Sequence, residues 1–352
     1  PHNEYNLSIG GERQMSVRDR YKVEFSIPFA GPLVTIQDMG RPGNMRYGVS
    51  ASGPMDRVSF EAANAALGNE KNQTAIEISL GGLILQCKEG PISIAITGGN
   101  FTIEYQDQKI SSWTVLTIQK GERLSIRAGD AGSWAYLAFS GKINAKNWLG
   151  SDATHSTSGF GGGFLKSGQK ITIDNPSIKE NRIGAILKPE FYLKGPIQAV
   201  LGPQEQHFMK PSVERFTRDI FEVSKNYDRM GMQLKGPKLE LNNALSIPSE
   251  PIIRGSVQVS GDCTPTVLLA DHQTTGGYPK IATVISSDID RLSQLRAGDT
   301  FKFSLISSSQ AINITRKFLY KKEKYLQKIS VARGTLEQRL MSENLIGGYK
   351  YN

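Results

Sequence analysis

One segment of the chain concentrates side chains that could recognise a small, planar, hydrogen-bonding ligand. It covers residues 270–282 and follows an apolar run that is typical of a strand. Amide, hydroxyl and backbone N–H groups crowd into its centre, at Gln273, Thr274, Thr275, Gly276, Gly277 and Tyr278. Asp271 and Lys280 add charges of opposite sign close by. Because glycine lets the backbone approach a ligand closely, the segment suits an amide, ureido or carboxylate group, or else its side chains cap a structural turn.

Two further regions combine glycine with charged or polar side chains. In residues 37–43, Asp38 and Arg41 could form an ion pair that fixes a loop, or Arg41 could hold an anionic group. Arg229 lies in another glycine-bearing turn and presents the same two alternatives. Gln258 follows in an apolar, strand-like run and is a candidate substrate contact.

Familiar signatures of nucleotide and metal binding are missing. Residues 161–167 superficially resemble a phosphate-binding loop, but Leu165 stands where that loop needs a glycine. The four histidines have no spacing that fits a zinc site, so we expect no metal. Cys87 and Cys263 lie far apart, and the apolar run before Cys87 predicts a buried strand residue. Two reduced thiols are typical of a cytoplasmic protein.

The composition excludes several classes of function. Hydrophobic residues make up 38% and charged residues 21% of the 352 residues, which is typical of a globular protein. No run approaches the roughly 20 apolar residues that span a bilayer. The net charge of +9 comes largely from a basic stretch over residues 316–328. Without a nucleic-acid-binding motif, this stretch indicates a solvated face or a docking surface for an acidic partner, and we expect neither nucleic acid nor membrane as a partner.

The elements that must position these residues are mainly strands. Short runs rich in Val, Ile, Thr and Phe recur between glycine-rich turns, at residues 33–36, 92–97, 115–118, 137–139, 199–201, 267–270 and 301–303. A glycine followed by a polar residue and alternating apolar residues occurs at Gly121, Gly168 and Gly298, in both halves of the chain. The pattern predicts a mostly β protein built from barrels or sandwiches.

Few helices are expected. Residues 55–67 predict a helix, with Ser52 available as its N-cap and Gly68 after its end. Residues 288–295 predict a second helix, and residues 317–343 predict one or two more.

We divide the chain into four parts. An N-terminal extension over residues 1–22, interpreted as trimmed or disordered, is set aside from the fold. The parts that follow are a first barrel domain over residues 23–180, a second over residues 190–315 and a basic helical segment over residues 316–352. Proline-punctuated residues 175–194 serve as the linker.

Several motifs in a fixed order resemble the allophanate hydrolase subunit 2 family, also described as the biotin-dependent carboxyltransferase family or the family of the C-type 5-oxoprolinase subunit. The resemblance runs from about residue 31 to residue 303. It rests on residues 35–41, 52–56, 63–64, 67–69, 149–151, 228–231 and 273–282. Together the motifs are far more specific than any one of them. The resemblance implies two cyclophilin-like β-barrel domains with few helices.

For function, the resemblance implies the C-type subunit of an ATP-dependent 5-oxoprolinase, an amide or lactam hydrolase that converts 5-oxoproline to glutamate only in a complex. Its partners would be a subunit 1 homologue, which corresponds to the B-type subunit, and a homologue of the ring-opening A-type subunit, with ATP bound in the complex. One alternative is the carboxyltransferase subunit of a biotin-dependent urea or amide carboxylase, which takes carboxybiotin from another chain. Another is a non-catalytic regulator that binds a kinase-inhibitor homologue.

If the resemblance holds, the polar segment acts on the amide or lactam. The expected catalytic residues are Asp271, Gln273, Thr274 and Lys280. The expected substrate-binding residues are Asp38, Arg41, Arg229, Gln258, Thr275, Gly276, Gly277 and Tyr278. Their donors would orient the substrate and stabilise the negative charge that develops on its oxygen.

The sequence departs from the family pattern in places. His272 stands where an arginine is usual, residues 140–142 replace a glycine pair, and Gly163 and Gln169 stand where arginine and aspartate are common. If the usual arginine binds an anion, a neutral histidine does so less well. These departures bear on the substrate more than on the fold.

Overall fold

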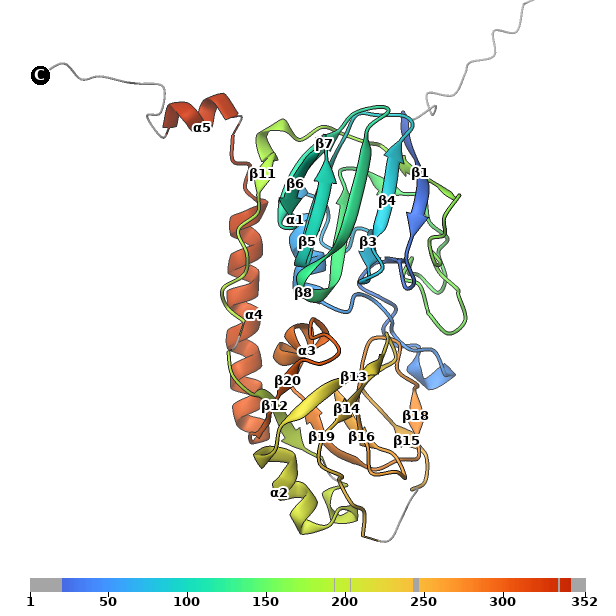
Figure 1. The fold of residues 1–352 in the computed structure, drawn as a ribbon, viewed down its shortest axis with the longest axis vertical. Helices are drawn as coiled ribbons and strands as arrows, with labels where there is room; N and C mark the ends of the chain where they lie inside the picture. Colours follow the sequence, from blue (N-terminus) through green and yellow to red (C-terminus); the bar gives the residue numbers. More distant parts are fainter. Residues whose placement is uncertain (1–20, 193, 203, 243–246, 335, 343–352) are drawn as a thin grey trace, which may run out of the picture.

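The computed structural model describes residues 21–192, 194–202, 204–242, 247–334 and 336–342. The described part is mostly β, as predicted, and two large sheets lie one above the other along the long axis (Figure 1). Nearly all of the extension over residues 1–22, and the last ten residues of the basic segment, lie outside the described residues. The division into four parts stays a prediction.

The first sheet takes in the strands of the N-terminal half. They pair in the order β11-β7-β5-β8-β4-β1-β10-β9, while β3 joins β2 to β8 and β6 pairs with β5. The strands are β1 (Lys22–Ala30), β2 (Thr35–Gln37), β3 (Ala75–Ile78), β4 (Leu83–Cys87), β5 (Ile92–Tyr105), β6 (Gln108–Ser111), β7 (Thr114–Ile118), β8 (Arg123–Phe139), β9 (Lys142–Ile143), β10 (Lys170–Asp174) and β11 (Gly184–Ala185). Cys87 is buried in β4, as predicted.

The second sheet is a nearly closed barrel. Its order is β20-β13-β14-β17-β16-β19-β12-β21. The strands are β12 (Ile197–Leu201), β13 (Phe221–Tyr227), β14 (Gly231–Lys235), β16 (Ser256–Val259), β17 (Pro265–Leu268), β19 (Lys280–Val284), β20 (Thr300–Phe301) and β21 (Phe303–Leu305). The two edge strands, β20 and β21, are separated only by Lys302, so the sheet must curl round to bring its edges together. The sequence predicted one strand over residues 301–303, but the chain passes there from one edge to the other.

The helices lie around and between the sheets. They are α1 (Arg57–Leu67), α2 (Lys210–Arg218), α3 (Ser286–Ser293), α4 (Ser308–Ser330) and α5 (Leu336–Ser342), with 3-10 turns at Met45–Tyr47, Glu180–Arg182 and Glu205–His207. Helix α2 was not expected from the sequence. A capping box between Ser307 and Gln310 starts α4, which runs alongside both sheets (Figure 1). Among the described residues, no helix combines the length and apolar character needed to cross a membrane.

The N-cap of α1 differs from the prediction. Ser52 was expected to cap the helix, but the Asp56 carboxylate accepts a hydrogen bond from the backbone N–H of Ser59 at 3.0 Å. Ser52 has a positive φ of 56° and lies in the turn before the cap. The prediction failed because Ser52 precedes the turn that brings the chain into the helix, whereas Asp56 directly precedes the first helical residue.

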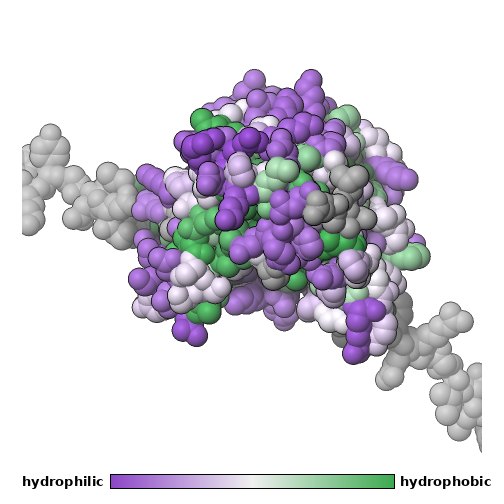
Figure 2. Space-filling view, turned by 90° about the horizontal axis from the view of Figure 1, so that it is seen from below, coloured by the Kyte–Doolittle hydropathy of each residue, from purple (hydrophilic) through white to green (hydrophobic). Residues whose placement is uncertain are grey.

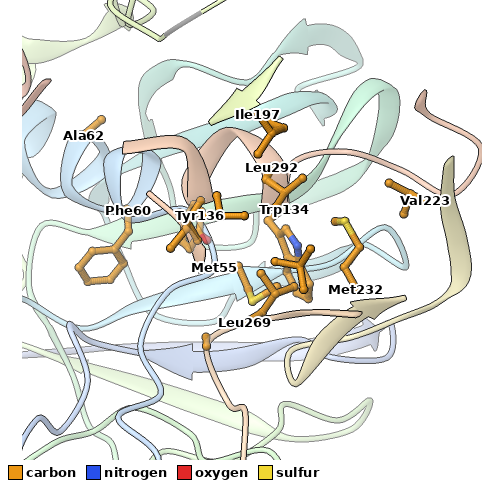
Figure 3. Close-up of a cluster of buried hydrophobic side chains, with 14 of the residues drawn as sticks. Met55, Phe60, Ala62, Trp134, Tyr136, Ile197, Val223, Met232, Leu269 and Leu292 are labelled. Atoms are coloured by element: carbon orange, nitrogen blue, oxygen red, sulfur yellow. The ribbon is translucent and has the colours of Figure 1, made fainter. Parts of the chain in front are cut away.

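One hydrophobic core joins the two sheets. Met55, Trp134 and Tyr136 from the first half share a buried cluster with Met232, Leu269 and Leu292 from the second (Figure 3). Polar contacts at the end of α3 reinforce it, because Gln294 donates to the Asp56 carboxylate at 2.8 Å and to the Trp134 carbonyl at 3.0 Å. The loops before α1 are thereby held against the second barrel.

Candidate functional site

The polar segment connects β17 to β19 and borders a small cavity on the second barrel. The cavity has a volume of about 210 Å³ and is lined by Met230, Gly231, Gln258, Ser260, Thr266, Leu268, Gln273 and Tyr278. Gln258 on β16 stands opposite Thr266 on β17, so antiparallel pairing places both side chains on the same face. Three predicted residues therefore meet here, Gln273 and Tyr278 from the polar segment and Gln258 from a separate strand.

Hydrogen bonds fix the amide groups of this cavity. Gln273 Nε2 donates to Gln258 Oε1 at 3.0 Å, and Gln258 Nε2 donates to the backbone carbonyl of Tyr278 at 3.4 Å. A Cβ atom at Gly276 would lie 2.7 Å from Gln258 Nε2, so a larger residue there would displace the Gln258 amide. The segment thus holds a pair of side-chain amides in a defined orientation.

Lys280 stands opposite Gln258 on the neighbouring strand β19. Its side chain is only 10% exposed, and its Nζ atom is buried without a hydrogen-bond partner. The Glu250 Oε2 atom lies 3.6 Å from Nζ, and Gln204 links the two residues by accepting from the Lys280 N–H at 2.9 Å and donating to the Glu250 carboxylate. A buried ammonium group with unused N–H donors is suited to bind a carboxylate or a developing oxyanion.

The threonines and glycines of the segment build a short ribbon. Thr275–Gly276 forms β18 and pairs with β15 (Glu250–Pro251). The Thr274 carbonyl accepts from the Ile252 N–H at 3.1 Å, and the Gly277 carbonyl accepts from the Ile247 N–H at 2.7 Å. The ribbon brings Glu250 beside Lys280. The predicted catalytic role of Thr274 and the substrate contacts of Thr275, Gly276 and Gly277 stay predictions.

Arg229 lies at the boundary between the two sheets and is fully buried. Its guanidinium donates to Asp271 from Nε at 2.8 Å and from Nη2 at 3.3 Å, to the Gly53 carbonyl at 2.7 Å, and to Glu77 on β3. Burial alone would lower the pKa of Arg229, but the charges of Asp271 and Glu77 raise it above its ordinary value. Because protein groups take up these donors, the contacts favour the structural ion pair over an anion site.

Asp271 begins the polar segment and faces away from its amides. Burial alone would raise the pKa of Asp271, but the Arg229 charge and the hydrogen bonds from Arg229, Ser52 and Ser156 hold it below its ordinary value. Asp271 is therefore ionised near neutral pH and tied to the first half of the chain, where the Ser156 N–H donates to it at 3.2 Å. This placement gives Asp271 a role in fixing the segment.

Asp38 and Arg41 have separate partners. Asp38 accepts from the Gly40 N–H at 2.8 Å and from the Ser151 hydroxyl at 2.6 Å. Arg41 donates to the Trp148 carbonyl at 3.3 Å and to the Ser52 hydroxyl at 3.2 Å, and its guanidinium lies 4.9 Å from the centre of the Trp148 ring. Within the described residues these two side chains form no ion pair with each other, and neither lines the amide cavity.

His272, at the position where the resemblance implies an arginine, is buried. Burial lowers the pKa of His272 below its ordinary value, and the nearby Arg254 charge lowers it further. The hydrogen bond to the Gln273 carbonyl raises this pKa but does not outweigh burial. Its Nδ1 atom lies 2.6 Å from the Gln273 carbonyl oxygen. His272 thus supports the backbone of the segment. No group of three or more His, Cys, Asp or Glu side chains in the described part of the chain could hold a metal ion.

The sequence analysis did not select three residues that lie near the site. Glu77 lies between Ile76 and Ile78 on a buried strand, and a carboxylate in such a run is a signal that a buried partner must exist. Gln204 and Glu250 lie in polar, proline-containing stretches that gave no comparable signal.

The buried carboxylate of Asp56 predicts a pH-dependent stability. Burial and the neighbouring Asp290 charge raise the pKa of Asp56 to about 6, against an ordinary value of 3.8. Because the native state then binds this proton more tightly than the unfolded chain, the contribution of Asp56 to the free energy of unfolding falls as the pH rises from about 4 to about 6. At about 1.4 kcal/mol per pH unit, the loss is about 3 kcal/mol.

Urea unfolding of the wild type and of Asp56→Asn at several pH values between 4 and 7 checks this expectation. The stability of the wild type relative to the variant should decrease across the window. A difference that does not change with pH would contradict it.

Most of the chain matches one known protein family. Residues 47–305 match the model described as carboxyltransferase domain, subdomain A and B. The chain belongs to the carboxyltransferase domain family. The resemblance deduced from the motifs is thereby confirmed, and the family's matched region contains both the amide cavity and most of the buried ion-pair network.

Relatives of this carboxyltransferase-family chain are enzyme subunits or larger enzymes. It is 35% identical over 286 residues to the C-type 5-oxoprolinase subunit of Haemophilus influenzae, covering 80% of this chain and 91% of that protein. The corresponding protein of Escherichia coli is 32% identical with the same coverage. Urea amidolyase of Saccharomyces cerevisiae is 31% identical over 312 residues, but the match covers only 17% of that protein.

Solved structures extend the similarity. The urea amidolyase of K. lactis aligns with a TM-score of 0.76 at 27% identity, covering 87% of this chain and 20% of that one. The urea carboxylase of Kluyveromyces lactis gives the same TM-score at 26% identity, with 87% and 29% covered. This chain therefore spans only a part of those larger enzymes, in contrast to its nearly full coverage of the 5-oxoprolinase subunits.

Proposed function

We propose that this chain is the C-type subunit of an ATP-dependent 5-oxoprolinase, which converts 5-oxoproline to glutamate together with homologues of the A-type and B-type subunits. The observation that carries the proposal is the 35% identity to the C-type 5-oxoprolinase subunit of Haemophilus influenzae over 91% of that protein. The urea amidolyases match over only a small share of their own length, so they are weaker evidence for the function of this chain than the 5-oxoprolinase subunits.

The site offers groups that complement a lactam. The amides of Gln258 and Gln273 present both donors and acceptors, which is the pattern that a lactam N–H and carbonyl require. Lys280 is not part of the cavity lining, but it pairs with Gln258 on the neighbouring strand, and we infer that its buried ammonium group serves the substrate carboxylate or the oxyanion that develops during ring opening. The chain would bind and orient 5-oxoproline, while the partner subunits complete the reaction.

ATP does not fit the amide cavity. A triphosphate needs cationic side chains or a cradle of N–H groups at a helix N-terminus, and the cavity lining contains no lysine or arginine. We therefore assign ATP to another part of the complex and ascribe no step on this chain to it.

A second candidate function is carboxyl transfer. The TM-score of 0.76 to both a urea amidolyase and a urea carboxylase favours it. In that case Gln273 and Tyr278 would hold the ureido group of a carboxybiotin supplied by another chain. The same hydrogen-bonding pattern fits both substrates, because lactams and ureido groups are both planar amides.

Glutamate release separates the two candidates. We expect 5-oxoproline to yield glutamate only when ATP, this chain and homologues of the A-type and B-type subunits are all present. Omitting this chain from the otherwise complete mixture is the control, and product is measured by amino-acid analysis. If a verified complex releases no glutamate but carboxylates urea or another amide from carboxybiotin, the oxoprolinase proposal is wrong.

A further inference from the structure

A second cavity lies between the start of α4, the start of α3 and strands β12 and β19. Its volume is about 420 Å³, and it shares no lining residue with the amide cavity. Ile285 and Ile289 from the region of α3 line it, and Ile253 and Ile312 stand at its rim, 57% and 51% exposed. Figure 2, which views the end of the molecule that carries the second barrel, shows hydrophobic patches set among hydrophilic surface.

The charged groups of this cavity have one sign. Two arginines, Arg254 and Arg316, belong to its lining, and none of the lining residues is acidic. Thr283, Ser286 and Thr315 add hydroxyl groups. A cavity of this size with apolar walls and a few convergent polar groups has the character of a small-molecule site.

Arg254 is a cation without a counter-charge. It donates from Nη1 to the Pro54 carbonyl at 3.0 Å and from Nη2 to the Met55 carbonyl at 2.5 Å. Its Nε atom is buried and has no hydrogen-bond partner. In the described residues no carboxylate lies within ion-pair distance of it, in contrast to Arg229.

The surroundings of Arg254 penalise its charge. Burial, followed by the like charge of Arg57, lowers the pKa of Arg254 to about 10, and the attraction of Asp290 offsets this only in part. An anion bound in the adjoining cavity would stabilise the guanidinium, because it would supply the counter-charge that Arg254 lacks.

We propose that this cavity binds an organic carboxylate with an apolar body. The carboxylate pairs with the arginines of the lining, Arg254 and Arg316, and the apolar body packs against Ile289 and Ile312. This site is separate from the amide cavity and does not depend on the proposed function.

Calorimetric titration of the full chain with octanoate tests the proposal, with octanol as a neutral probe of the same length. Octanoate should bind at least about tenfold more tightly than octanol, as expected for a charge-assisted contact. Ile312→Asp should weaken octanoate binding by about tenfold or more, because it places a negative charge in the apolar wall. Arg254→Met, which keeps the aliphatic bulk, should reduce the preference for octanoate over octanol, and an unchanged preference in the folded variant would overturn the role of Arg254.

Ile178→Asp is the matched control, because Ile178 is 45% exposed and lies outside the cavity. It should bind octanoate as the wild type does. The proposal is overturned if octanoate does not bind, if octanol binds equally well, or if Ile312→Asp leaves octanoate affinity unchanged. Ile312 is exposed, so the Ile312→Asp variant should fold. Its octanoate affinity therefore tests the proposal even if Arg254→Met fails to fold.

Discussion

Replacing Arg229 with methionine lowers the free energy of unfolding by about 3–5 kcal/mol, the range observed when one partner of a buried ion pair is removed. Glu77 and Asp271 both have fully buried side chains and would lose the cation that pairs with them. The Gly53 carbonyl would also lose a donor. Methionine fills much of the volume but satisfies none of these groups, so the two halves of the chain should separate more easily.

Urea unfolding measured at pH 7 checks this value. Arg218→Met is the matched control, because Arg218 pairs with Asp219 on the surface with 70% of its side chain exposed, and we expect no measurable change in stability. Adding Glu77→Gln and Asp271→Asn to Arg229→Met should recover part of the loss by removing the stranded charges. A loss below about 1 kcal/mol for the single variant would show that the network contributes little.

Replacing Lys280 with methionine reduces turnover of the assembled complex by about 10²–10³-fold, the effect of removing one donor that stabilises a developing oxyanion. The Lys280 Nζ atom has no hydrogen-bond partner, and its ion-pair partner Glu250 lies 3.6 Å away. Burying such a group costs free energy in the folded chain. We therefore expect the same variant to be as stable as the wild type or more stable.

A loss of turnover without a loss of stability in Lys280→Met would show that Lys280 has a functional role and not a structural one. Turnover is measured as ATP-dependent glutamate release, and stability by urea unfolding of the isolated chain. Lys120→Met, at an exposed lysine paired with Glu89, should change neither. Wild-type turnover by Lys280→Met in a fully assembled complex would remove Lys280 from the site.

Much of the fold could be predicted because it depends on local pattern. Alternating apolar residues after Gly121 and Gly168 place one face of β8 and β10 in a core, and that period is visible in the sequence alone. Helix α1 ends at Gly68 as predicted, since a glycine with positive φ terminates the helix. The order of short motifs was enough to identify the family.

The candidate site was predicted only in part. Gln258, Gln273 and Tyr278 were selected by residue type, and the structure brings them to one cavity. Arg229 and Asp271 were selected for the same reason, but they pair with each other, and Arg229 also pairs with Glu77, which lies 152 positions away in the chain. Residue type alone does not distinguish a charge that awaits a ligand from one that already has a partner.

The sequence by itself determined the strands, the family and the polar segment, because local conformational preference and motif order are properties of neighbouring residues. Only the tertiary structure decided which charges are satisfied. Arg229 is fully buried and Arg254 is partly buried, yet one has two carboxylates and the other only backbone carbonyls. The difference arises from long-range strand pairing and from the packing of one sheet on the other, which set the distance between groups that the sequence places far apart.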